Sequence, residues 1–153
     1  MKKLGILLLG LVLLFSSGCQ KDKLEGEASV LIGTWNWTAS YLVPNHCEED
    51  SLWNFKLRDT VSATSSYSLE FQEKGKLIFR HNDGLIWNKR IVFSEKQKIE
   101  DPTFDYRFTI LLDNQADDPM VLLVGGDSLL TYDFPKDTDN DCEEMFNYFE
   151  MEY

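Results

Sequence analysis

The side chains best suited to chemistry in this chain are the carboxylates of one acidic run, Asp137-Thr138-Asp139-Asn140-Asp141-Cys142-Glu143-Glu144. Acids at alternate positions are typical of calcium loops, because Ca²⁺ takes about six to eight oxygen ligands. The EF-hand pattern fails here, since Cys142 stands where glycine makes the sharp turn and Tyr148 stands where a bidentate Glu is needed. Taken alone, the run is interpreted as a solvated hairpin loop.

Other catalytic and metal-binding patterns are weak. His46 and Cys47 are adjacent and lack the spacing of zinc ligands. No Gly-x-Ser-x-Gly elbow is present to support a Ser–His–Asp arrangement. With 26 Asp and Glu residues, a pair of carboxylates for glycoside hydrolysis could be drawn anywhere. The sequence therefore favours a protein that is not an enzyme and has no cofactor other than a weakly bound calcium ion.

Residues 1–19 have the order of a secretory signal: two lysines, an apolar run, and small residues before a cysteine. The run Leu4–Phe15 would span about 18 Å as a helix. A membrane-spanning helix is the alternative, but it must cross about 30 Å of hydrocarbon. Ser16-Ser17-Gly18-Cys19 resembles the signal of a bacterial lipoprotein. This resemblance implies cleavage after Gly18 and a lipid on Cys19.

The same resemblance predicts the organisation of the chain and its location. We expect a removed signal peptide (1–18), a lipid-anchored tether (19–29) and one barrel domain (30–153). Gln20-Lys21-Asp22-Lys23 resembles the charged segment that sends some lipoproteins of Gram-negative lineages to the cell surface. We expect an outer-membrane lipoprotein, on either the periplasmic or the cell-surface face of that membrane.

If Cys19 carries lipid, Cys47 and Cys142 are an even pair in an oxidising compartment, which predicts a disulfide between them. Two unpaired thiols are the alternative. A disulfide would crowd acids from two segments, and a cation would relieve their repulsion. We expect a weak calcium site there, with the ligands Glu48, Asp139, Asp141 and Glu143.

The charge of the chain restricts its partners. The full chain has 15 Lys and Arg residues against 26 Asp and Glu residues, a net charge of −11. Loss of Lys2 and Lys3 with the signal leaves 13 basic residues and a net charge of −13. Nucleic-acid binders carry basic faces, so nucleic acid is excluded as a partner. Attachment to a membrane would have to come from the lipid anchor.

Hydrophobic residues recur with a period of two along the chain, which is typical of half-buried strands. In the first strand, Gly33, Trp35, Trp37, Ala39 and Tyr41 are expected on one face. Turn residues such as Asn82-Asp83-Gly84 separate the strands. Further strands are expected at 66–72, Lys76–His81, Leu85–Ser94, Asp105–Leu112, Met120–Val124, Ser128–Phe134 and Glu144–Glu152. The pattern predicts an all-β, antiparallel sandwich or up-and-down barrel of about eight strands.

Leu31-Ile32-Gly33-Thr34-Trp35 resembles the Gly-x-Trp opening of lipocalins, and more closely the Gly-Thr-Trp start of small lipocalin-like bacterial lipoproteins. The long segment Pro44–Ser65 fits the lid-like first loop of that architecture. The resemblance implies a small up-and-down barrel that binds a small hydrophobic or amphipathic ligand in its mouth.

Aromatic side chains are the candidates for binding. Trp35 and Trp37 are expected to fill the barrel floor. Residues proposed to contact a ligand or partner are Trp53, Phe55, Tyr106 and Phe108. The alternative function is a structural or interaction lipoprotein with a filled barrel, which binds a protein or a glycan through its loops. Interior volume separates the two, because small eight-stranded barrels are either packed solid or hold one ligand.

Overall fold

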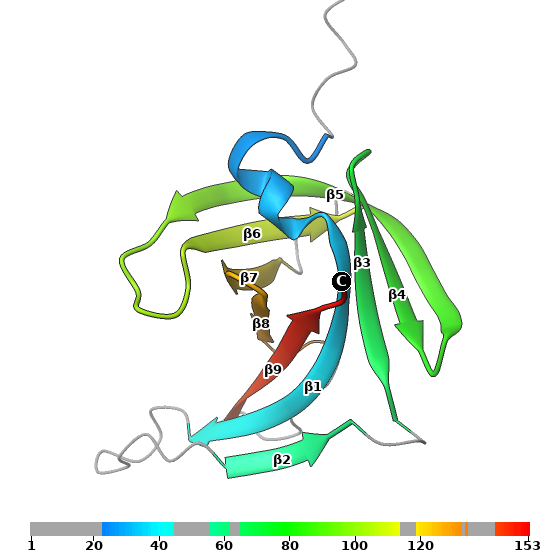
Figure 1. Ribbon diagram of the computed structural model, residues 1–153, viewed down its shortest axis with the longest axis vertical. Coiled ribbons are helices and arrows are strands. Elements are labelled where there is room, and N and C mark those ends of the chain that lie inside the picture. The colour runs from blue at the N-terminus through cyan, green and yellow to red at the C-terminus, as the bar shows by residue number, and fades with distance from the viewer. Residues whose placement is uncertain (1–22, 45–55, 62–64, 114–118, 133, 135–142) are drawn as a thin grey trace, which may run out of the picture.

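The structure, a computed structural model, describes residues 23–44, 56–61, 65–113, 119–132, 134 and 143–153. In these residues we find one 3₁₀ helix and nine strands (Figure 1). They are η1 (Gly26–Leu31), β1 (Gly33–Pro44), β2 (Lys56–Thr60), β3 (Tyr67–Gln72), β4 (Lys76–His81), β5 (Gly84–Lys98), β6 (Tyr106–Leu112), β7 (Met120–Gly125), β8 (Ser128–Tyr132) and β9 (Glu143–Met151).

The strands form a closed antiparallel barrel. From β3 to β9 each strand pairs with the next, and β9 pairs with β1 from Trp35↔Met151 to Pro44↔Glu143. Strand β1 and strands β3 to β9 are therefore the eight strands of the barrel, and β2 is an extra strand on β1. The predicted all-β up-and-down barrel is confirmed. Closure leaves the barrel strands without an open edge, which would otherwise invite aggregation.

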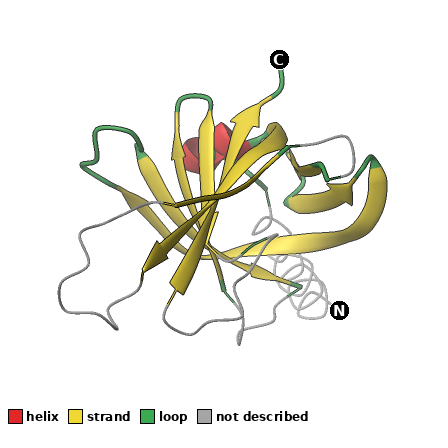
Figure 2. Ribbon diagram, turned by 90° about the horizontal axis from the view of Figure 1, so that it is seen from below, coloured by secondary structure: helices red, strands yellow, loops and turns green. Residues whose placement is uncertain are grey.

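Helix η1 covers one end of the barrel, which we call the closed end. Figure 2 shows it, in red, against the strands at the end where the C-terminus lies. Ala28 and Leu31 are fully buried there. The indole Nε1 of Trp35 donates a hydrogen bond to the Leu31 carbonyl at 2.8 Å. Trp35 therefore joins the helix to the first strand.

The segment before η1 also belongs to the fold. Leu24 is buried in the core, and its backbone N–H donates to the Glu73 carbonyl at 3.0 Å. The sequence placed a solvated tether as far as Ser29. Over Leu24–Ser29 that prediction is wrong, because Leu24 and Ala28 bury apolar surface against the barrel. Glycine and polar residues around these two side chains hid this short apolar contact.

The half of the barrel next to η1, which we call the closed half, is filled by apolar side chains. Trp35, Phe71 and Phe149 are among the largest of them, and each is at most 1% exposed. Burial of each such side chain stabilises the fold by about 2–3 kcal/mol. The other members of this core are Leu69, Leu77, Ile91, Phe108, Ile110, Leu122, Val124 and Leu129.

Strand β1 contains a β-bulge that changes which side chains face inward. The register between β1 and β9 shifts between Trp37 and Ala39, so Thr38 is an extra residue. Beyond the bulge Ser40 takes the inward position, where its hydroxyl accepts a hydrogen bond from Trp37 Nε1 at 3.0 Å. The predicted placement of Ala39 and Tyr41 on the tryptophan face is wrong for this reason.

We expect Trp35→Phe to lower the free energy of unfolding by about 2 kcal/mol or more, because it leaves the Leu31 carbonyl unpaired and opens a small cavity. Urea unfolding of residues 20–153, which contain the whole barrel, measures this. The matched control is Trp87→Phe, since Trp87 is half-buried and its indole makes no hydrogen bond within the described chain. Equal losses for the two variants would contradict a special role for Trp35.

Candidate functional site

Six ring side chains gather in the half of the barrel away from η1, which we call the mouth half. They come from β1, β3, β4, β5 and the residue that follows β8 by two positions. We call them the aromatic cluster: Trp37, Tyr67, Phe79, His81, Trp87 and Phe134.

Tyr67 lies at the centre of one side of the aromatic cluster. Its ring stacks on His81 at a centroid distance of 4.5 Å and on Phe79 at 5.8 Å. Trp37 meets the same ring edge-on at 5.4 Å. Strand register explains these contacts, because Tyr67 is paired with His81 across β3 and β4, and directly opposed residues share a face.

Phe79 connects this side to the far side of the barrel. Its ring centroid lies 5.4 Å from that of Trp87 and 4.9 Å from that of Phe134. Trp87 and Phe134 are also in contact, at 5.7 Å. The hydroxyl of the buried Thr131 donates to the Phe134 carbonyl and so holds this residue beside the barrel.

The aromatic cluster combines two buried rings with four rings that are partly exposed to solvent. Trp37 and Phe79 are buried, at 1% and 7% exposure. Tyr67, His81, Trp87 and Phe134 are half-buried. Half-buried aromatic rings over a buried apolar floor are typical of the lining of a site for a small molecule.

A few polar groups lie among these rings. The buried Ser40 hydroxyl donates to Asn147 Oδ1 at 2.5 Å, and Asn147 is itself fully buried. His81 Nε2 is buried and has no hydrogen-bond partner among the described residues. A buried polar atom without a partner costs about 1–3 kcal/mol, so this nitrogen is a ready contact for a polar group of a ligand.

A hollow of about 330 Å³ opens beside the aromatic cluster, and we call it the lateral hollow. It lies where β1 changes partner: β1 pairs with β3 up to Asn36 and with β2 from Ala39. Trp37 and Tyr67 are among the residues that line it. The other lining residues are Asn36, Val61, Ser66, Ser68, Arg80, Asp83 and Glu152. Its volume is at the lower end of the range for small-molecule sites.

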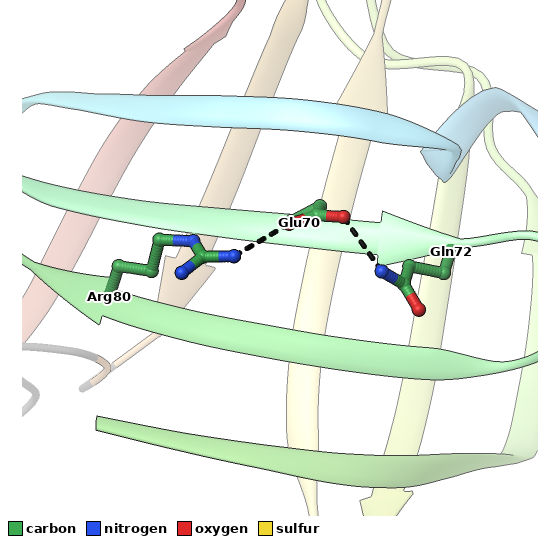
Figure 3. Close-up of polar contacts among 3 residues, drawn as sticks. All are labelled: Glu70, Gln72 and Arg80. Carbon is green, nitrogen blue, oxygen red and sulfur yellow. Dashed lines mark hydrogen bonds and ion pairs between the residues drawn. The ribbon is translucent and has the colours of Figure 1, made fainter. Parts of the chain in front are cut away.

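On the outer face of β3 and β4, Glu70 accepts hydrogen bonds from Gln72 Nε2 at 2.8 Å and Arg80 Nη2 at 3.2 Å (Figure 3). The bond from Gln72 is the main cause of a lowered pKa of the Glu70 carboxyl. Arg80 lowers that pKa further, while burial opposes the shift. The charge of Arg80, a lining residue of the lateral hollow, is thus paired with Glu70.

Three of the residues that the sequence proposed for binding lie in the described part of the chain: Tyr106, Phe108 and Glu143. Phe108 is fully buried and Tyr106 stacks on it at 5.9 Å, in the closed half and away from the mouth. Glu143 begins β9 opposite Pro44. The remaining candidates lie outside the described residues: Cys19, Cys47, Glu48, Trp53, Phe55, Asp139, Asp141 and Cys142. The calcium site and the disulfide stay predictions.

Sequence reasoning missed most of the aromatic cluster. The period of two in the sequence is enough to place Tyr67 and Phe79 on the inward face of their strands. No local signal shows that these rings belong to the mouth half, because that depends on how the strands pair. Within the described chain, no group of three metal-ligating side chains is found.

Comparison of the chain with protein-family models, with curated proteins and with solved structures found no match. No helix in the described part of the chain is long and apolar enough to cross a membrane.

We expect the free energy of unfolding of Glu70→Gln to fall less steeply than that of the wild type as the pH is lowered. Because the folded pKa of Glu70 is lowered, its contribution is complete above the unfolded pKa and is lost as the pH falls through the folded value. At neutral pH the variant should lose about 0.2–1 kcal/mol, as for partly exposed pairs. Urea unfolding between about pH 2 and pH 7 measures this, because carboxyl groups ordinarily titrate within this range.

The control for this prediction is Glu150→Gln, which replaces an exposed acid on β9 that is in neither ion pair of the described chain. If the free energy of unfolding fell equally steeply at acid pH in Glu70→Gln and the wild type, Glu70 would not be a source of this pH dependence.

Proposed function

We propose that this protein is a membrane-anchored lipoprotein that binds, without catalysis, a small hydrophobic or amphipathic ligand in the mouth of its barrel. The observation that carries the proposal is the half-buried aromatic cluster over a buried floor. A protein that only needed a filled barrel would gain stability by burying Tyr67, Trp87 and Phe134 fully, and these rings are left partly accessible.

The two halves of the barrel contain different kinds of side chains, and this difference supports the proposal. The closed half is packed with aliphatic and aromatic side chains and sealed by η1. The mouth half instead combines rings with a small number of polar groups, which is the composition of small-molecule sites. The resemblance of Gly33-Thr34-Trp35 to lipocalin-like lipoproteins points the same way, as an analogy of fold rather than of site.

The proposed anchor is a lipid on Cys19 in the outer membrane, on the periplasmic or the cell-surface face. Since the barrel begins at Leu24, the linker to the lipid would be Gln20–Lys23, shorter than the sequence suggested. A fully extended chain of this length reaches about 14 Å. The barrel would therefore stay close to the bilayer surface.

The alternative, a lipoprotein that binds a protein or a glycan, is favoured by exposed apolar side chains. Leu85 and Ile86 at the β4–β5 hairpin are 60% and 54% exposed, and Leu57 on β2 is 59% exposed. These side chains lie on the surface and not in the aromatic cluster, so the two functions predict different sensitive residues.

We expect the neutral probe N-phenyl-1-naphthylamine to bind residues 20–153 with a rise in its fluorescence. Trp87→Ala should weaken binding about tenfold or more, because a ring of this size contributes roughly 1.5–3 kcal/mol when it is covered. Leu85→Ala, on the same strand but at the exposed hairpin, should leave binding unchanged. Absence of probe binding to the wild type, or a larger effect of Leu85→Ala, would favour the alternative function.

We expect intact-mass measurement of the protein extracted from its own cells to show a lipid on an N-terminal Cys19. The register Pro44↔Glu143 brings together the chain segments that lead to Cys47 and Cys142. We therefore expect a mass two hydrogens below that of the reduced form. Such a bond would close a loop of about 95 residues and add roughly 4–5 kcal/mol at most. An unprocessed N-terminus, or two alkylatable thiols in the native protein, would contradict these assignments.

A further inference from the structure

Lys89 faces the inside of the barrel. It is paired with Leu77 across β4 and β5, and Leu77 is fully buried in the core. Two positions away on either side, Trp87 and Ile91 also face inward, in contact with the core. Side chains alternate along a strand and opposed residues share a face, so register and alternation agree on this placement. The Lys89 side chain is half-buried.

No described carboxylate neutralises this lysine. The ion pairs in the described chain are Lys23–Glu25 and Arg80–Glu70. The contact found for the Lys89 ammonium is the ring of Trp87, whose centroid lies 5.6 Å from Nζ. In a chain with 26 acidic residues, an inward cation without an acidic partner among the described ones is unexpected. Partial burial of an unpaired ammonium is costly, and an anion that binds beside it would recover that cost.

The pairing of β5 with β6 ends beside Lys89. Strand β5 pairs with β4 from Gly84 onward but with β6 only from Ile91 (Figure 1). The Arg90 carbonyl accepts from the Asp113 N–H at 2.8 Å, which marks the end of this pairing. Lys89 thus lies where the β5–β6 seam ends, next to Trp87 of the aromatic cluster.

We propose that the ligand is an amphipathic anion whose acidic group is bound by Lys89 and whose apolar part lies on the aromatic cluster. This inference rests on the proposed function and adds the chemical class of the ligand. The chemistry required is a carboxylate or phosphate group on an aliphatic or aromatic body. The net negative charge of the protein does not attract such a ligand, so we assign the selectivity to Lys89, which acts at short range.

Three probes that share one chain and differ in the head group test the inference: decanoate, 1-decanol and decylammonium. Binding of each to residues 20–153 is measured by calorimetric titration. We expect decanoate to bind at least tenfold more tightly than 1-decanol, and decylammonium to bind most weakly, because charge-assisted hydrogen bonds are the stronger ones. Lys89→Met should weaken decanoate binding about ten- to hundredfold and leave 1-decanol binding unchanged.

The matched control is Lys96→Met. Lys96 lies on the same strand and its ammonium is 4.3 Å from the centroid of the Phe93 ring, but the residue is exposed. It should not alter the binding of any probe. Lys89→Gln repeats the test with a polar neutral side chain, and thermal melting confirms that each variant is folded. Lys89→Arg should retain the preference for decanoate.

The outcomes separate this inference from the proposed function. If 1-decanol binds the wild type as tightly as decanoate, or if Lys89→Met and Lys96→Met behave alike, the role of Lys89 is overturned and the proposed function stands. If none of the three probes binds the wild type, the proposed function fails and the inference fails with it.

Discussion

The structure depends above all on the antiparallel pairing of β1 with β9. Asn36 and Glu152, 116 positions apart, are linked by a hydrogen bond of 3.3 Å at one end of this seam. At the other end Pro44 lies opposite Glu143. Without this pairing the sheet would keep two free edges, and the inward side chains of all eight strands would face water instead of one another. The Trp35–Leu31 bond, the core and the aromatic cluster all require the closed barrel.

The bulge at Thr38 divides the inside of the barrel into two environments. Before it, Trp35 and Trp37 extend the apolar core. After it, Ser40 faces inward and forms a buried polar chain with Trp37 and Asn147. The same region is where β1 exchanges β3 for β2, which opens the lateral hollow beside Trp37 and Tyr67. One extra residue in β1 thus accounts for the inward position of Ser40 and its buried polar contacts, and bulges are common near functional sites.

Two basic residues on neighbouring strands, Lys89 on β5 and Arg80 on β4, lie in different surroundings within this acidic protein. The acids dominate the chain as a whole, whereas Lys89 faces the inside of the barrel and forms no ion pair with a described carboxylate. Arg80, by contrast, is used on the outer face, where Glu70 and Gln72 hold it in a structural network. The two cations therefore lie in different surroundings although their strands are neighbours.

The local elements of the fold can be predicted from the sequence alone. The period of two in Leu69 and Phe71, and the turn at Asn82-Asp83, where both residues adopt positive φ, suffice to predict strands and a hairpin, because they report dihedral preferences of adjacent residues. The closure of the barrel, the bulge, the packing of Leu24 and Ala28, and the inward position of Lys89 could not be predicted from the sequence. Each of these depends on contacts between distant segments, and alternation within one strand does not tell which face will meet the core or which end will stay open.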